Sequence, residues 1–424
     1  MDILSIINQD YYKKRFGIIV RLLRVRYRYT LRGLSEQVHL SHAYLRKIEL
    51  ANTSINRKVY DRLMGAFNFH IEYDAALEHE FYDQWKTFNQ SVIHLNKTGY
   101  DSAYSAIMEK AKRHKHSLWM VEYLLLSIGY KFQTLDYVGE DYTQVHDELL
   151  SVEPLLDDST KQFYYWVLGN YYYHIGDLLK SRRMIERIFT IDASESFLAI
   201  AYYLIGLSHS LTFSLKKGNR YLRKALRMFQ EQHNYLRQET ITVFIEVNQM
   251  KMAHFENVEK TFNQGLEAGK ASGLSTFVRY VLYNYAIYHL KRGQPEEALH
   301  KLERIDVPSY RVYFYKAYIH HKMNDSDTVL ASIEEASRKV DDDYSDNLMH
   351  FYGMMVLKAF HINDDSLMEQ YSSVFFDECM LRSGYFEIDI AYHFYKRHLI
   401  DRRRYKDAYK LANRMIAMTK KAFD

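Results

Sequence analysis

Apolar residues recur at helical spacing along almost the whole chain, and two short segments near the N-terminus show the pattern most clearly. The apolar positions of these segments are Leu31, Leu34 and Val38 in the first and Leu45 and Ile48 in the second. Each set lies on one face of a helix. Thr30 and Ser41 precede the two segments and are suitable N-caps, and His39-Leu40 leaves room for a tight turn. The pattern predicts two amphipathic helices in tandem.

The second of these helices turns a polar, basic face outward. His42, Ala43, Arg46 and Lys47 occupy that face, with Tyr44 near its edge. A short helix with such a face can enter the major groove of DNA. An ordinary helical hairpin with a solvated cationic face would give the same pattern, and periodicity alone leaves both interpretations open.

The segment 31–51 resembles the helix-turn-helix of Xre/Cro-type repressor domains. Leu34-Ser35, Leu40-Ser41 and Ile48-Glu49 occupy positions of that motif, whereas His39 and Ala51 stand where the family usually has glycine. The resemblance covers about residues 13–69 and implies a DNA-binding domain over residues 1–70, with flanking helices at 13–28 and 55–67. The residues expected to contact DNA are Arg32, Ser41, His42, Ala43, Tyr44, Arg46, Lys47, Arg57 and Lys58.

Charge is distributed unevenly along the chain. The segment 11–62 contains 13 Lys/Arg and 3 Asp/Glu, whereas the net charge of the whole chain is +4. In the helix expected at 13–28, Lys14, Arg21, Arg24 and Arg28 would face outward. The rest of the chain is mildly acidic. A basic N-terminal segment on an acidic body is typical of a nucleic-acid-binding domain joined to a regulatory one.

Residues 71–424 have the pattern of a long series of helix pairs. Pro (3) and Gly (16) are scarce, which favours helices joined by short turns. The segment 163–193 carries Leu168-Gly169-Asn170, Tyr172 and Gly176-Asp177, which resemble the marks of a tetratricopeptide repeat. Small residues at Gly169 and Ser181 would let its two helices approach closely.

The same pattern recurs, less regularly, along the rest of this region. Further matches include Gly206 with Gly218, Leu222 and Ala225; Ala286 with Gly293, Ala298, Leu302 and Ile305; Ala317 with Val329, Ile333 and Ala336; and Ala408 with Ala412 and Met415. Weaker pairs fill 77–114, 117–154, 239–269 and 346–376. The fold class predicted is all-α, with a helix-turn-helix domain followed by an α-solenoid of about nine helix pairs.

The first helices of such pairs line a concave groove that suits an extended peptide. The residues expected to face it are Trp166, Asn170, Tyr173, Tyr203, Val247, Tyr280, Asn284, Arg311 and Phe314. An Asn amide can pair with a peptide main chain, and Arg311 could hold a carboxylate. Packing within the solenoid would explain the same residues without a ligand.

A Xre-type head joined to tetratricopeptide repeats resembles the peptide-sensing regulators grouped as Rap, Rgg, NprR, PlcR and PrgX, and the bacteriophage arbitrium receptors. The resemblance implies a cytoplasmic homodimer that binds double-stranded operator DNA and a short signalling peptide. An alternative is a solenoid adaptor that sequesters a protein partner, with DNA binding secondary. The sequence specifies neither the peptide nor the operator.

No arrangement of residues indicates catalysis, a cofactor or a metal site. Gly265 and Gly269-Lys270 lack the spacing of a phosphate-binding loop, and His79-Glu80 lacks the second histidine of a zinc motif. The chain is therefore not expected to be an enzyme. The uncharged segment 197–215 approaches membrane-spanning length, but its repeat register favours a buried solenoid helix. One cysteine and an N-terminus unlike a signal peptide fit the cytoplasm.

Overall fold

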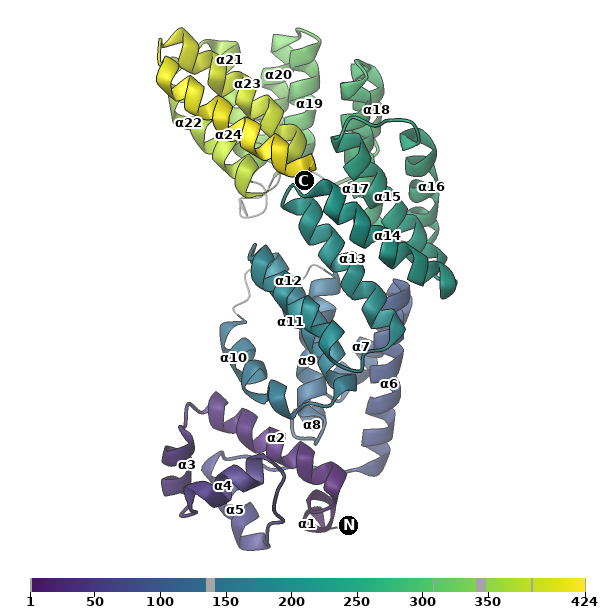
Figure 1. The fold of residues 1–424 in the computed structure, drawn as a ribbon, viewed down its shortest axis with the longest axis vertical. Coiled ribbons are helices and arrows are strands. Elements are labelled where there is room, and N and C mark those ends of the chain that lie inside the picture. The colour runs from purple at the N-terminus through teal and green to yellow at the C-terminus, as the bar shows by residue number, and fades with distance from the viewer. Residues whose placement is uncertain (1, 135–141, 308, 341–347, 383, 424) are drawn as a thin grey trace. The chain divides into compact units, whose positions relative to one another are not determined.

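The computed structural model describes residues 2–134, 142–307, 309–340, 348–382 and 384–423, and its regular elements are helices (Figure 1). The chain divides into two compact units, Met1–Ala201 and Tyr202–Asp424. Unit 1 begins with five helices that together form the head of the chain. They are α1 (Ile3–Ile7), α2 (Asp10–Arg26), α3 (Leu31–Gln37), α4 (His42–Glu49) and α5 (Arg57–Ala66).

The two tandem helices begin and end as their sequence predicts. The Thr30 hydroxyl accepts a hydrogen bond from the Gly33 amide at 2.9 Å, and the Ser41 hydroxyl accepts one from the Tyr44 amide at 3.2 Å. These bonds satisfy amides that no helical carbonyl can reach. His39 and Ala51 both have left-handed backbone, with φ of 52° and 58°. They adopt the conformation for which glycine is usual.

Gly17 marks a close approach between α2 and α4 in the head. A Cβ atom at this position would lie 2.6 Å from the Ile48 carbonyl oxygen and 2.8 Å from that of Glu49, at the end of α4. Both atoms belong to the backbone and cannot move aside cheaply. Gly17→Ala is expected to destabilise the head by about 1–3 kcal/mol, a typical cost of overpacking. Faster hydrogen exchange of the α2 and α4 amides would report this loss.

Gly65 supplies the matched control, because a Cβ there meets nothing within 4 Å. Since alanine is the better helix former, Gly65→Ala is expected to leave those amides protected or to protect them further. Equal exchange rates in the two variants would show that α2 and α4 do not need this contact.

The remaining helices of unit 1 follow a short irregular connection at residues 67–74. They are α6 (Ala75–His94), α7 (Lys97–Glu109), α8 (Ala111–His114), α9 (Met120–Thr134), α10 (Thr143–Val152), α11 (Asp158–His174) and α12 (Leu178–Glu186), with 3-10 turns η1 (Glu153–Leu155) and η2 (Arg187–Thr190). Helix α13 (Glu195–Leu211) contains the boundary between the two units.

The prediction of a helix pair at 117–154 in unit 1 is wrong. Helix α9 packs against α11, whereas α10 packs along α2 of the head. Arg26 of α2 and Glu148 of α10 form a two-pronged ion pair, with Nε–Oε1 and Nη2–Oε2 distances of 3.1 and 2.8 Å. The segment 117–154 is therefore not a repeat of the solenoid, because its second helix covers the head instead.

The repeat expected at 163–193 is confirmed in α11 and α12. The Ser181 hydroxyl donates to the Gly169 carbonyl at 2.7 Å, and a Cβ on Gly169 would clash with the Ile185 side chain. Gly176 adopts a φ of 82° at the turn between the helices. The small residues thus serve the close packing that their pattern predicts.

Unit 2 continues as successive helix pairs with a shared aromatic and aliphatic core. Its helices are α14 (Leu215–Glu231), α15 (Tyr235–Lys251), α16 (Val258–Ala271), α17 (Ser275–Lys291), α18 (Pro295–Glu303), α19 (Tyr310–Lys322), α20 (Ser326–Lys339), α21 (Leu348–Ile362), α22 (Asp365–Leu381), α23 (Tyr385–Asp401) and α24 (Tyr405–Phe423). The expected pair 346–376 starts outside the described residues, and α21 begins at Leu348. The all-α repeat fold is confirmed.

None of the helices in the described ranges has both the length and the apolar character needed to cross a membrane. The uncharged segment 197–215 forms most of α13 and the turn after it, and its Phe197 and Ile205 side chains are buried.

Candidate functional sites

The first candidate site is the outer face of α4 in unit 1. Leu45 and Ile48 are buried against the head, whereas His42, Ala43, Arg46 and Lys47 are exposed. Among the described residues, Arg46 and Lys47 have no ion-pair partner. The face therefore combines free cations with small and hydrogen-bonding side chains, as contact with base edges and phosphates requires.

The other residues expected to contact DNA are exposed or lie at the edge of this face. Ser41 is the cap of α4, and Tyr44 is half-buried with its hydroxyl donating to the Ser54 carbonyl at 3.3 Å. Arg32 pairs with Glu36, and Arg57 pairs with Asp2 at 2.5 Å. Lys58 is exposed at the start of α5. The contact of these residues with DNA stays a prediction.

Part of the basic charge of the head is used internally. Arg15 and Arg26 pair with Glu122 and Glu148 of the helices that follow the head, and Arg24 pairs with the buried Glu49 of α4. The helical pattern places Arg24 on the solvent side of α2, and this expectation is wrong. The charge surplus of segment 11–62 therefore overstates the positive surface that DNA could meet.

The second candidate site is a cavity of about 190 Å³ in unit 2. It lies among helices α13, α15, α17, α19, α21 and α23 and the turn before α23. Its lining residues are Leu211, Met250, Lys251, Tyr280, Asn284, Ile287, Lys291, Arg311, Met349, His350, Arg382, Gly384, Tyr385, Phe386 and Glu387. Two lysines, two arginines and one glutamate therefore meet an apolar wall.

The acidic residue, Glu387, is held in a buried hydrogen-bond network. Its Oε1 accepts from the Tyr315 hydroxyl and from Nε2 of His350, the latter at 3.2 Å. Burial alone would raise the pKa of Glu387, but the His350 hydrogen bond, the nearby Arg311 charge and the Tyr315 hydrogen bond bring it down to about 2. Burial lowers the pKa of His350. Glu387 is therefore ionised at neutral pH.

Two of the cations in the cavity are suited to an anionic ligand. Arg311 stacks on Tyr283 with 4.2 Å between Cζ and the ring centroid, and its buried Nε has no hydrogen-bond partner in the described part of the chain. Burial lowers the pKa of Lys251 to about 8. An orphaned buried donor beside a desolvated ammonium group forms a natural carboxylate site.

Three of the nine residues predicted to bind a peptide line this cavity: Tyr280, Asn284 and Arg311. The Asn284 Nδ2 donates to the Tyr280 carbonyl at 2.8 Å. That bond fixes the amide and uses one of its two N–H donors, which leaves the other donor and the carbonyl oxygen for a ligand.

The other six predicted residues lie elsewhere. Trp166, Val247 and Phe314 are at most 3% exposed and belong to the core, so their contact with a ligand stays a prediction that this structure does not support. Tyr203 is buried and holds Arg237 over its ring at 5.5 Å. Asn170 and Tyr173 are half-buried in unit 1, where the Asn170 amide donates to the Trp166 carbonyl at 2.7 Å.

Sequence reasoning missed the side of the cavity formed by α21 and α23. Met349, His350, Phe386 and Glu387 lie in segments where the repeat pattern is weak, so register assigned them no face. A charged residue with apolar neighbours on both sides, as Glu387 stands between Phe386 and Ile388, was the one signal that could have indicated a buried polar site.

Comparisons with known proteins show what the fold resembles. No protein-family model and no curated protein matches the chain. A solved structure of a Rap protein complexed with competence and sporulation factor aligns with a TM-score of 0.60 at 11% identity, covering 82% of this chain and 98% of that one. The apo form of the quorum sensor NprR from B. thuringiensis aligns at 0.54 and 14% identity, covering 81% and 99%.

A third structure, described as aspartyl phosphate phosphatase F from Bacillus subtilis, aligns at 0.49 and 13% identity, covering 83% of this chain and 96% of that one. The first two alignments show that this chain has the repeat fold of Rap and NprR. The resemblance to the peptide-sensing group is thus confirmed for the fold. That the chain is not an enzyme stays a prediction.

Proposed function

We propose that this protein is a cytoplasmic transcription regulator that binds operator DNA through α4 and a short signalling peptide through the cavity of unit 2. The observation that carries the proposal is the convergence on one cavity of Tyr280, Asn284 and Arg311, three residues that the repeat register assigns to a peptide groove. The fold shared with a Rap protein complexed with competence and sporulation factor, and with the quorum sensor NprR, supports it.

The proposed peptide contacts follow from the donors and acceptors in the cavity. Asn284 offers a carbonyl oxygen and an N–H, which match one peptide unit independently of its side chain. Arg311 and Lys251 offer donors for a carboxylate, either the C-terminus or an acidic side chain. The apolar wall of Ile287, Met349 and Phe386 would bury a hydrophobic side chain next to it.

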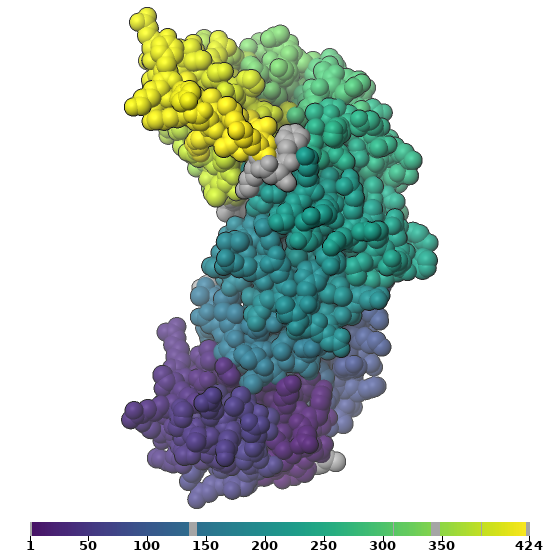
Figure 2. Space-filling model, viewed as in Figure 1, coloured from purple at the N-terminus to yellow at the C-terminus, as the bar shows by residue number. Residues whose placement is uncertain are grey.

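A second copy of the chain is the proposed partner for α24, because operators of this kind are read by paired heads. Tyr405, Tyr409 and Ile416 are 64%, 69% and 53% exposed. They recur at spacings of four and seven residues, so they lie on one face of the helix. Helix α24 is seen in yellow on the surface of unit 2 in Figure 2. Large apolar and aromatic side chains that are exposed together on one helix face favour self-association.

Replacing Tyr409 and Ile416 by lysine is expected to weaken the dimer by roughly 100-fold, because each copy loses two apolar side chains that the proposed interface would bury. Sedimentation velocity over a concentration series measures this. Tyr235→Lys is the control, since Tyr235 is 71% exposed at the start of another helix, α15. A dimer equally stable in both variants would exclude α24 as the interface.

The proposed function is tested with the DNA that flanks the gene. Purified protein is expected to prefer its own promoter fragment to random duplex, with an affinity that falls steeply as salt rises. Binding to both duplexes with equal affinity at every salt concentration would exclude sequence-specific regulation. Capture of one folded protein by the solenoid would then favour the sequestering adaptor.

A further inference from the structure

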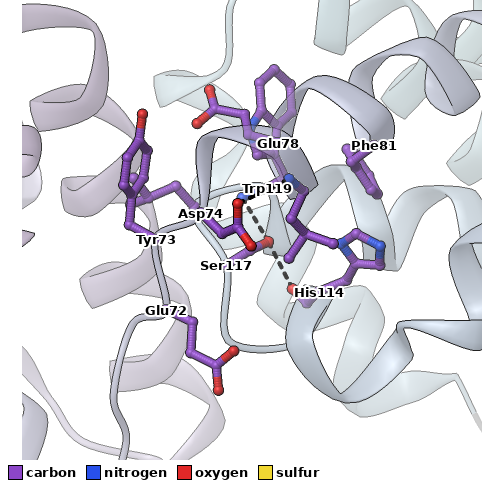
Figure 3. A pocket seen from close by; sticks show the side chains of 10 residues that line it. Glu72, Tyr73, Asp74, Glu78, Phe81, His114, Ser117 and Trp119 are labelled. Atoms are coloured by element: carbon purple, nitrogen blue, oxygen red, sulfur yellow. Dashed lines mark hydrogen bonds between the residues drawn. The ribbon is translucent and has the colours of Figure 1, made fainter. Parts of the chain in front are cut away.

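A groove of about 320 Å³ lies in unit 1 where the head meets the first repeat helix. Its wall contains five aromatic side chains and one carboxylate: Tyr11, Tyr12, Tyr73, Tyr82, Trp119 and Glu78. Tyr11 and Tyr12 belong to α2 of the head, Tyr73 to the connection, and Glu78 and Tyr82 to α6. Figure 3 shows a neighbouring pocket, whose lining shares Tyr73, Glu78 and Trp119 with this groove.

The aromatic rings of the groove pack against one another, and two of them are half exposed. Tyr12 packs edge-on against Tyr11 and Tyr73 at centroid distances of 5.1 and 5.8 Å, and Tyr82 lies 5.8 Å from Trp119. Tyr11 and Tyr82 are 52% and 50% exposed. Core packing does not need half-exposed rings of this size, so the groove offers aromatic surface to a ligand.

Charge in the groove selects the kind of ligand. Glu78 accepts a hydrogen bond from the Tyr12 hydroxyl at 3.0 Å, which orients its carboxylate on the wall. Among the described residues that line the groove there is no Lys or Arg. The histidine of the wall, His79, is exposed and lies 3.5 Å from Asp83. Glu78 forms no ion pair with the described part of the chain, and electron-rich ring faces beside such a carboxylate favour a cation.

The same aromatic residues already hold one cation. The Arg15 guanidinium carbon lies 3.6 Å from the centroid of Trp119 and 5.0 Å from that of Tyr11, and both residues also line the groove. Arg15 is itself committed to Glu122 at 2.9 Å. The wall therefore binds a guanidinium on the protein side while part of its aromatic surface faces the groove.

We propose that this groove binds a cationic side chain, of the arginine or lysine type, presented by a protein or peptide partner. The ring faces and Glu78 supply the attraction, and a guanidinium stacks on aromatic rings more favourably than a neutral group of the same shape. Because the wall combines residues of α2, the connection and α6, a bound cation ties the head to the first repeat helix.

The test compares two small probes on the full-length protein. N-acetyl-arginine methylamide carries the guanidinium, and N-acetyl-citrulline methylamide has nearly the same shape without the charge. Saturation-transfer NMR titration is expected to give millimolar binding of the arginine probe, at least five-fold tighter than that of the citrulline probe. Equal binding of the two probes, or binding of neither, would overturn the proposal.

Variants locate the binding on the wall. Tyr82→Leu and Glu78→Gln are each expected to weaken the arginine probe at least three-fold while helix content stays unchanged. Tyr235→Leu, which removes an exposed tyrosine in unit 2, is expected to have no effect. If the arginine probe had the same affinity for every variant as for the parent protein, its binding site would lie elsewhere and the assignment would be refuted.

Discussion

Replacing Arg46 and Lys47 together by alanine is expected to weaken promoter binding by roughly 100-fold or more while leaving the head folded. Both side chains are exposed on α4 and make no ion pair among the described residues, so their removal breaks no contact of the head. The slope of affinity against salt should also become shallower, by about 0.9 for each phosphate that the variant no longer neutralises. Fluorescence anisotropy at several salt concentrations measures both changes.

The control removes the same charge from another helix. Lys216 and Lys217 are exposed at the start of α14 in unit 2, and their replacement by alanine is expected to leave promoter affinity nearly unchanged. If the two double variants bound DNA equally well, α4 would not be the recognition helix. Loss of helicity in the Arg46/Lys47 variant would instead mean that the outward face of α4 is misassigned.

Glu387→Ala is expected to cost unit 2 about 3–5 kcal/mol, as removal of one partner from a buried charged network typically does. The Tyr315 hydroxyl and His350 would lose their acceptor, and Arg311 would lose the negative charge nearby. The loss in the free energy of unfolding is measured by urea titration, with hydrogen exchange of the α19 and α23 amides as the readout for unit 2. Glu378→Ala, which breaks only the partly exposed pair with Arg382, is expected to cost less than about 1 kcal/mol.

The same network predicts how stability depends on pH. The pKa of Glu387 is about 2 in the folded protein, below its ordinary value of 4.5. The unfolded chain therefore takes up this proton first, so the contribution of Glu387 is present above pH 4.5 and is lost as the pH falls towards 2. Glu387→Gln should remove this part of the acid sensitivity. An unchanged acid transition would contradict an ionised Glu387.

Helices α3 and α4 of the head were predictable from sequence because local contacts set them, whereas α1 was not predicted. Thr30 and Ser41 each bond an amide three residues ahead, so the caps that define α3 and α4 lie within one turn of the chain. Gly169 and Ser181 likewise mark the close approach in the clearest repeat, and their contact joins neighbouring helices. Structure that depends on residues close together in the sequence was therefore the part that could be predicted.

Contacts between distant segments were not predictable. Helix α10 has a pattern that fits a repeat, yet it packs on α2 through Arg26 and Glu148, which are 122 residues apart. Glu387 likewise depends on Tyr315, 72 residues earlier. Periodicity identifies the buried face of a helix but not its partner, which also explains why the repeat register assigns Phe314 to the groove when it belongs to the core.

A peptide bound in unit 2 is expected to change the affinity of the head for DNA, and Asn284→Ala tests this coupling most directly. Anisotropy of a labelled promoter fragment is measured with and without synthetic peptides encoded by the short reading frames beside the gene. We expect one peptide to shift the affinity of the parent protein at least ten-fold, and Asn284→Ala to bind DNA normally but to lose this shift. A shift of equal size in the variant, or no shift with any peptide in the parent protein, would contradict the coupling.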